Sequence, residues 1–435
     1  MSKASSRART AAVILSLGAF TPIGAQQAND PALVARARAI HDRVIALDTH
    51  VDINPSQFTT AHPNYTDRLN TQVNLPKMQE GGLDAVFFSI YVGQGPLTAE
   101  GYQRAYDADM EKFAAVHRLA EQLAPDKIEI AYRADDVAKI AAKGKKVALM
   151  GVENAYGIGT DITNIKKFYD QGARYMSLAH NGHSQMSDSN TGERDGVWLY
   201  HGLSPLGKQA VAELNRVGIM IDISHPSKES MMQTLALTKA PIIASHSAVR
   251  ALCDVSRNLD DEQLLALKKN GGVVQMVGFS GYVKRPVPPS AERQQAIAAL
   301  RSEFGLPAAG GGGGGGGRGG FQSLAPEKRA EYQRRMARVD SQFPPPPRAT
   351  VKDFVDHIDY AVKLIGVDHV GISSDFDGGG GVDGWNDASE TFNVTLELVR
   401  RGYTEEQIAK MWSGNLIRVM REVEKVAQRE GKKAA

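Results

Sequence analysis

Short apolar runs alternate with segments of helical periodicity along most of the chain. Eight of these runs are nearly continuous and several are rich in β-branched residues, which is typical of parallel strands buried on both faces. They are VIALDTHVD (44–52), DAVFFSIYV (84–92), VALMGVEN (147–154), YMSLAHN (175–181), GIMIDISH (218–225), PIIASHS (241–247), GGVVQMVGF (271–279) and HVGISSDFDG (369–378).

The segments between these runs have the apolar spacing of amphipathic helices. SPLGKQAVAELNRVG (204–218) opens with Ser-Pro and closes at Gly, and TVKDFVDHIDYAVKLIG (350–366) also closes at Gly. These are ordinary signals for the start and end of a helix. Eight strand-helix units predict a (β/α)₈ TIM barrel, and a doubly wound open sheet is the alternative.

Polar residues gather where the apolar runs end, which is the end at which barrel enzymes assemble their catalytic groups. These residues are His50, Asp52, Glu153, His180, His225, His246 and Asp375. Because side chains alternate along a strand, positions 50 and 52 share one face and can point together into the barrel mouth. Asp48 lies one residue pair deeper, so we expect it to support them.

Polar groups placed repeatedly at the same end of buried strands would cost stability unless they shared a task. Histidines and carboxylates together suit zinc or a similar borderline divalent ion, and a carboxylate on a middle strand can bridge two ions. Two adjacent ions would lower the pKa of a bridging water and polarise a carbonyl group bound beside them.

Composition adds limits to this picture. The chain has 435 residues, 42% of them hydrophobic, which is enough for one large domain or two ordinary ones. Cys253 is the only cysteine, which excludes an internal disulfide and a thiolate-rich zinc site.

The first 25 residues have the pattern of a secretory signal peptide, with SRART, the apolar run AAVILSLGAF and the small residues of PIGA. The run is too short to span a bilayer, and a frayed amphipathic helix is the alternative. We therefore expect a periplasmic or secreted protein whose mature domain covers residues 26–435. Removal of three basic residues would change the formal charge from +2 to 2 − 3 = −1, which gives no electrostatic case for nucleic acid binding.

Several motifs resemble those of the membrane (renal-type) dipeptidase family in the amidohydrolase superfamily. They are DTHVD, GVEN, LAHN, DISH, SHS, SRNLDD and GISSDFDG, in this order, and longer stretches such as RGYTEEQIAKMWSGNLIRV (401–419) agree too. The resemblance runs from about residue 40 to 425, apart from one insertion.

The resemblance implies a dinuclear zinc site and a role for each residue. His50 and Asp52 would bind one zinc ion, His225 and His246 would bind the other, and Glu153 would bridge them. His180 would contact the substrate carbonyl and stabilise the oxyanion, and Arg257 would hold the terminal carboxylate of the substrate. Asp375 would shuttle the proton, with Asp377 as a fallback two residues along.

The implied function is hydrolysis of dipeptides, with L-D as well as L-L substrates. Within enzymes, the alternative is an amidohydrolase acting on N-acyl amino acids or other small amides, because the same metal site serves all of them. A non-catalytic periplasmic metal or peptide binder predicts loss of Glu153, His180 or Asp375, yet all three are present. Relatives often form homodimers, so a homodimer is an expectation without support from the sequence itself.

The stretch from about 284 to 350 departs from the family pattern. It contains the unbroken run Gly310 to Gly317 and the segment FPPPPR (343–348). Because it holds too few apolar residues to offset its ordering entropy, we expect a largely disordered, tolerated insertion. Its segment LAPEKRAEYQRRMARVD (324–340) is the one part with helical spacing. A lid, a partner-binding arm and a surface anchor are alternative roles.

Overall fold

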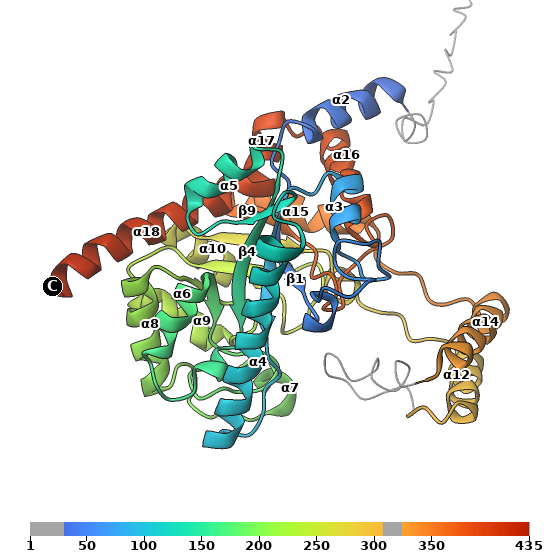
Figure 1. The fold of residues 1–435 in the computed structure, drawn as a ribbon, viewed down its shortest axis with the longest axis horizontal. Helices are drawn as coiled ribbons and strands as arrows, with labels where there is room; N and C mark the ends of the chain where they lie inside the picture. Colours follow the sequence, from blue (N-terminus) through green and yellow to red (C-terminus); the bar gives the residue numbers. More distant parts are fainter. Residues whose placement is uncertain (1–29, 308–323, 435) are drawn as a thin grey trace, which may run out of the picture.

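The computed structural model describes residues 30–307 and 324–434, so the predicted signal peptide lies outside the described residues. Eight parallel strands follow one another around the sheet in sequence order (Figure 1). They are β1 (Leu47–Asp52), β2 (Ala85–Tyr91), β4 (Lys146–Glu153), β5 (Ala173–Ser177), β6 (Met220–Asp222), β7 (Ile243–Ser247), β8 (Val273–Val277) and β9 (Val370–Ser373). A parallel bridge between Val51 and Phe376 brings the last strand back to the first. The predicted barrel is therefore confirmed, and the open-sheet alternative is wrong.

One short strand was not predicted. β3 (Ile128–Ile130) pairs with the first three residues of β4, from Lys146 to Ala148, while β5 pairs with β4 only from Met150 onward. Three residues without a continuous apolar run carry too little pattern to predict a strand. β3 thus extends the sheet at the N-terminal end of β4 and leaves the C-terminal end to the ring of eight.

Helices surround the barrel and connect its strands (Figure 1). The described α-helices are α2 (Pro31–His41), α3 (Leu75–Gly81), α4 (Ala99–Arg118), α5 (Ala134–Ala141), α6 (Asn164–Gln171), α7 (Gly192–Asp195), α8 (Pro205–Val217), α9 (Lys228–Leu237), α10 (Asp261–Asn270), α11 (Ser280–Val283), α12 (Ala291–Glu303), α14 (Pro326–Gln342), α15 (Val351–Ile365), α16 (Phe392–Arg400), α17 (Glu405–Ala409) and α18 (Asn415–Ala434). None of the helices in these two described ranges is long and apolar enough to cross a bilayer.

The C-terminal helix α18 closes one end of the barrel. Its buried residues, among them Leu416 and Val423, share an apolar cluster with the first residues of several strands, including Leu47, Ala85 and Val273. These strand residues lie at the N-terminal end of the barrel. Because apolar packing fills that end, the opposite end is left for polar side chains.

The insertion is more ordered than predicted. α12 and α14 pack against each other and bury Leu300, Leu306 and Tyr332 in a small apolar cluster of their own. Figure 1 shows the two helices to one side of the barrel. The helix predicted within 324–340 is confirmed, whereas the expectation of disorder is wrong for α12, because its apolar residues find partners on α14. The glycine run lies outside the described residues.

A buried acid packs against the segment that follows β4. Asp109 of α4 is fully buried against the 3₁₀ helix η4 (Ala155–Ile158), and a Cβ at Gly157 would lie 1.9 Å from its Oδ2. Neither carboxylate oxygen forms a hydrogen bond within the described residues. Burial raises the pKa of Asp109 well above its ordinary value, and Lys112 opposes the shift only in part.

We expect Asp109→Asn to stabilise the protein relative to the wild type at pH 8 and to have little effect near pH 4, because only the wild-type side chain ionises between these pH values. A carboxyl whose folded pKa is raised contributes its stability at acid pH and loses it as the pH rises from about 4 through the folded pKa. Urea denaturation at both pH values measures the difference. Glu111→Gln, at an exposed position of the same helix, is the matched control. Equal effects of Asp109→Asn at both pH values would contradict this prediction.

Candidate metal centre and active site

The Glu153 carboxylate lies at the centre of four imidazoles. Its Oε1 lies 2.9 Å from Nε2 of His225, 3.4 Å from Nε2 of His246 and 3.6 Å from Nε2 of His180. Its Oε2 lies 3.4 Å from Nε2 of His50. Residues from four different strands or the loops after them thus meet at the last residue of β4.

His50 is placed by a register shift and a tyrosine. The pairing of β1 with β2 shifts between Asp48 and Val51, so the chain departs from regular pairing at His50. Its Nδ1 lies 2.8 Å from the hydroxyl of Tyr175 on β5. The Tyr175 ring needs Gly151 opposite it, since a Cβ there would lie 2.0 Å from the ring. The glycine of the GVEN motif therefore makes room for the tyrosine that holds His50.

His225 and His246 face each other, with their Nε2 atoms 3.0 Å apart. The other ring nitrogen of each has a separate partner. Nδ1 of His225 lies 3.3 Å from Oδ1 of Asn181, and Nδ1 of His246 lies 2.8 Å from Oγ of Ser245. Both histidines thus turn Nε2 toward Glu153.

Asp52 and Asp375 converge on the same side of the cluster. A ligand atom from each and one from His50 lie within 4.8 Å of one another. A Cβ at Gly378 would lie 2.3 Å from Oδ1 of Asp375 and 2.3 Å from Oδ2 of Asp52, so only glycine leaves room for both carboxylates. Asp375 itself has a φ of 59°, an uncommon left-handed backbone for a non-glycine residue.

The fallback residue Asp377 is occupied elsewhere. Its two carboxylate oxygens accept hydrogen bonds from the backbone N–H groups of Gln72 and Val73, at 2.9 and 3.1 Å. Its own N–H donates to the side chain of Gln72. Asp377 therefore ties down the 72–73 loop, and Asp375 is the aspartate of this pair that enters the cluster.

Arg257 reaches the cluster from the loop after β7. Its Nη2 lies 3.1 Å from Nε2 of His225 and donates to the backbone oxygen of His246 at 3.2 Å. Its Nε and Nη1 are buried without a hydrogen-bond partner among the described residues. The guanidinium also lies 5.3 Å from the ring centre of Tyr282. A buried guanidinium with two unused donors is suited to a carboxylate ligand.

His180 lies beside the cluster on the loop after β5. Its ring centre is 4.1 Å from that of His225 and 4.6 Å from that of Tyr91. In contrast, Nδ1 of His183 accepts a hydrogen bond from the backbone N–H of Ser189 at 3.0 Å, which holds two parts of the same loop together.

The electrostatics follow from burial and from the neighbouring charges. Burial raises the pKa of Glu153, but attraction and hydrogen bonds from the surrounding histidines outweigh it and hold the pKa well below the ordinary value. Burial lowers the pKa values of His225 and His246 well below 6.5. Burial also raises the pKa of Asp375 well above its usual range, with a further contribution from the carboxylates of Asp52 and Glu153.

The donor set fits metal ions. Nε2 of His50 is buried without a hydrogen bond among the described residues. Nε2 of His225 and Nε2 of His246 face each other at 3.0 Å, and when both are unprotonated neither can donate a hydrogen bond to the other. Imidazole and carboxylate together are the ligands of zinc and similar divalent ions. Among the described residues, three groups of three histidine or carboxylate side chains bring their ligand atoms within 4.8 Å of one another, and two of these groups include Glu153. The residues present are therefore suited to hold metal.

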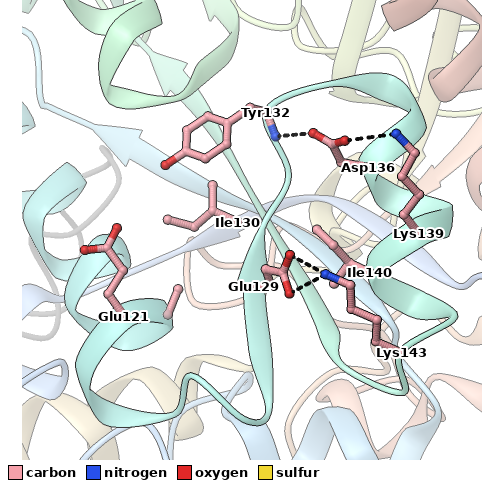
Figure 2. A pocket seen from close by; sticks show the side chains of 9 residues that line it. Glu121, Glu129, Ile130, Tyr132, Asp136, Lys139, Ile140 and Lys143 are labelled. Atoms are coloured by element: carbon pink, nitrogen blue, oxygen red, sulfur yellow. Dashed lines mark hydrogen bonds and ion pairs between the residues drawn. The ribbon is translucent and has the colours of Figure 1, made fainter.

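A surface pocket of about 440 Å³, drawn in Figure 2, shares no lining residue with this cluster. It is lined by η3 (Leu119–Leu123), β3 and α5, and its charges are largely paired, with Nζ of Lys143 2.8 Å from Glu129 and Nζ of Lys139 3.7 Å from Asp136. β3 pairs with the first residues of β4, whereas Glu153 is the last. This pocket therefore lies at the wrong end of β4 to be the active site.

The sequence model for membrane dipeptidases, peptidase family M19, matches residues 34–434. This chain belongs to the membrane dipeptidase family. Dipeptidase tcpJ of Claviceps purpurea (strain 20.1) is 31% identical over 367 residues, which cover 83% of this chain and 72% of the relative. Dipeptidase 3 of Rattus norvegicus is 27% identical over 413 residues, which cover 92% of this chain and 70% of the relative.

Solved structures agree with this assignment. The crystal structure of the probable dipeptidase PvdM from Pseudomonas aeruginosa is 34% identical, with a TM-score of 0.73, and the match covers 92% of this chain and 100% of that one. The metallo peptidase from Rhodobacter sphaeroides is 21% identical with a TM-score of 0.64, over 87% of this chain and 99% of that one, and supports the fold alone. As a member of the membrane dipeptidase family, this protein is a metal-dependent dipeptidase.

Sequence reasoning missed the residues that hold the histidines. Tyr175, Ser245 and Asp222 contact the predicted metal ligands or their neighbours from within the strands. One signal was present in the sequence, because a carboxylate in the middle of a buried run such as GIMIDISH is costly unless it accepts hydrogen bonds. Asp48, which was expected to support the site, accepts the backbone N–H of His50 at 3.2 Å.

Proposed function

We propose that the protein is a dinuclear zinc dipeptidase that cleaves the peptide bond of unblocked dipeptides. The position of Glu153 carries the proposal, because its two oxygens face different histidines. His50 and Asp52 would hold one ion, His225 and His246 the other, and Glu153 would bridge them. When bound, the ions supply a polarised amide carbonyl and a water of lowered pKa.

Arg257 and His180 would bind the substrate. The unused Nε and Nη1 donors of Arg257 match the two oxygens of a terminal carboxylate, which favours a free C-terminus over an amide. His180 lies beside Glu153 without being needed as a ligand in this assignment, so its imidazole is free to contact the carbonyl oxygen and stabilise the charge that develops there.

Asp375 would move the proton. It lies next to Asp52, beyond the C-terminal end of β9, and its carboxylate can accept a proton from water and return it to the leaving amine. The hydrogen bonds of Asp377 to the 72–73 loop leave Asp375 as the better placed of the two.

The substrate range would include L-D as well as L-L dipeptides. The Rhodobacter metallo peptidase was solved with a phosphinate mimic of the dipeptide L-Ala-D-Ala, which supports a test of that substrate here.

The charged N-terminal pattern of residues 1–25 further supports export to the periplasm or the exterior.

A substrate panel tests this function. We expect zinc-loaded protein to release free amino acids from L-Ala-L-Ala and L-Ala-D-Ala, and to cleave the corresponding dipeptide amides with kcat/KM about 10²-fold lower, because the amides leave Arg257 unpaired. Chromatographic quantification of the products gives these rates. Cleavage of N-acetyl amino acids alone would establish the rival amidohydrolase function, and two bound ions without any turnover would establish a binding protein.

A further inference from the structure

The seam between β6 and β7 is thinly paired. Only Asp222 and Ile243 form a ladder pair there, whereas β2 and β4 are paired along their whole length. The pairing of β7 with β8 also shifts register between Ala244 and Ser247, which is where His246 lies. Some other interaction must therefore fix this strand and the histidine that it carries.

Asp222 supplies that interaction from inside the sheet. Its Oδ1 accepts the backbone N–H of Ser245 on β7 at 2.8 Å and that of Ser224 on its own chain segment at 3.1 Å. Its Oδ2 accepts the hydroxyl of Ser245 at 2.6 Å. The side chain is fully buried, so these three donors satisfy a carboxylate that would otherwise be costly.

The hydroxyl of Ser245 links Asp222 to the imidazole of His246. Because its proton points to Asp222, its oxygen is left to accept, and the atom 2.8 Å away is Nδ1 of His246. Nδ1 must then carry the ring proton. The lone pair of His246 is consequently on Nε2, the atom that faces Glu153.

We propose that Asp222 and Ser245 are positioning residues that fix the tautomer and the ring orientation of His246. Nδ1 of His50 meets a tyrosine hydroxyl and Nδ1 of His225 meets an amide oxygen, so of these three histidines His246 is the one whose partner hydroxyl is itself oriented by a carboxylate. The inference rests on the proposed function, in which His246 is a zinc ligand. Its consequence is that the affinity of one zinc position depends on a carboxylate that touches neither ion nor substrate.

Asp222→Asn tests the relay with almost no change in shape. The amide keeps an oxygen for the two backbone N–H groups but turns an N–H donor toward Ser245. The hydroxyl must then donate to His246, which moves the ring proton to Nε2 and removes the zinc ligand. Ser245→Ala removes the hydroxyl, so either ring nitrogen of His246 can carry the proton. Ser247→Ala, on the other side of His246, removes a buried hydroxyl that does not contact the ring and is the matched control.

Zinc titration of the metal-free full chain against a competing chelator measures the effect. We expect wild type and Ser247→Ala to bind two zinc ions alike, and Asp222→Asn to weaken one of them by about 10- to 100-fold. The double variant Asp222→Asn with Ser245→Ala should bind that ion more tightly than Asp222→Asn alone, because the misdirected hydroxyl is gone. If Asp222 only stabilised the fold, the double variant would bind that zinc ion no more tightly than Asp222→Asn alone.

Two results would overturn the relay, namely unchanged zinc affinity in Asp222→Asn or no recovery in the double variant. Thermal unfolding of each metal-free variant shows whether it is folded. If Asp222→Asn fails to fold, Ser245→Ala alone must still weaken one ion by about tenfold. A wild-type chain that binds no zinc would overturn the dinuclear function itself, and this inference with it.

Discussion

Asp375→Asn is expected to lower kcat for dipeptide hydrolysis by about 10²- to 10⁴-fold, with the zinc content unchanged. The asparagine keeps the size of the side chain and its place beside Asp52, but it cannot accept a proton from water and return it to the leaving amine. Steady-state kinetics with L-Ala-L-Ala, together with metal analysis of the same samples, gives both quantities.

Asp377→Asn is the matched comparison, because Asp377 is two residues along and bonds to the 72–73 loop rather than to the cluster. We expect it to lower kcat by less than about tenfold, and its larger effect to be on thermal stability through the weakened loop contacts. Retention of activity in Asp375→Asn, or its loss in Asp377→Asn with normal folding, would show that the proton-transfer role has been given to the wrong residue.

Removal of metal is expected to abolish hydrolysis and to lower stability. Exhaustive dialysis against a chelator should leave no measurable turnover, and zinc should restore it. At a free zinc concentration about 100 times the dissociation constant of a site, each bound ion adds about 2.7 kcal/mol to the free energy of unfolding, because only the folded chain brings the ligands together. Denaturation with and without zinc measures this gain.

Glu153→Gln provides the control for the chelation experiment. The amide keeps the volume of the side chain but is uncharged and replaces one carboxylate oxygen by an NH₂ donor. It therefore cannot offer a negatively charged oxygen on both sides of the cluster. We expect zinc to stabilise this variant by less than half as much as the wild type. Full activity after verified loss of metal, or equal stabilisation of both proteins, would contradict a metal centre at Glu153.

The sequence was sufficient to predict the barrel and the members of the cluster. Each apolar run is local in the chain, and in a parallel barrel the residues that follow each run all lie at one end. This is why His50, Glu153 and His246 could be expected together although about 200 residues separate the first from the last. The roles of the individual residues remain predictions that the experiments above test.

Contacts between strands could not be predicted in the same way. The relay from Asp222 to His246 and the room that Gly151 makes for Tyr175 depend on register shifts, which leave no pattern in a single sequence. α12 was missed for a different reason. The composition of the whole 284–350 stretch, dominated by its glycine run, obscured a helix whose apolar residues pack in a small cluster shared with α14.

Anomalous diffraction at the zinc edge, from crystals of the zinc-loaded protein, tests the central claim most directly. The account predicts two peaks flanking Glu153, one within bonding distance of His50 and Asp52 and the other of His225 and His246, at about 2.0–2.2 Å from each ligand atom. A single peak, or a peak bonded to His180 in place of His246, would contradict the dinuclear assignment.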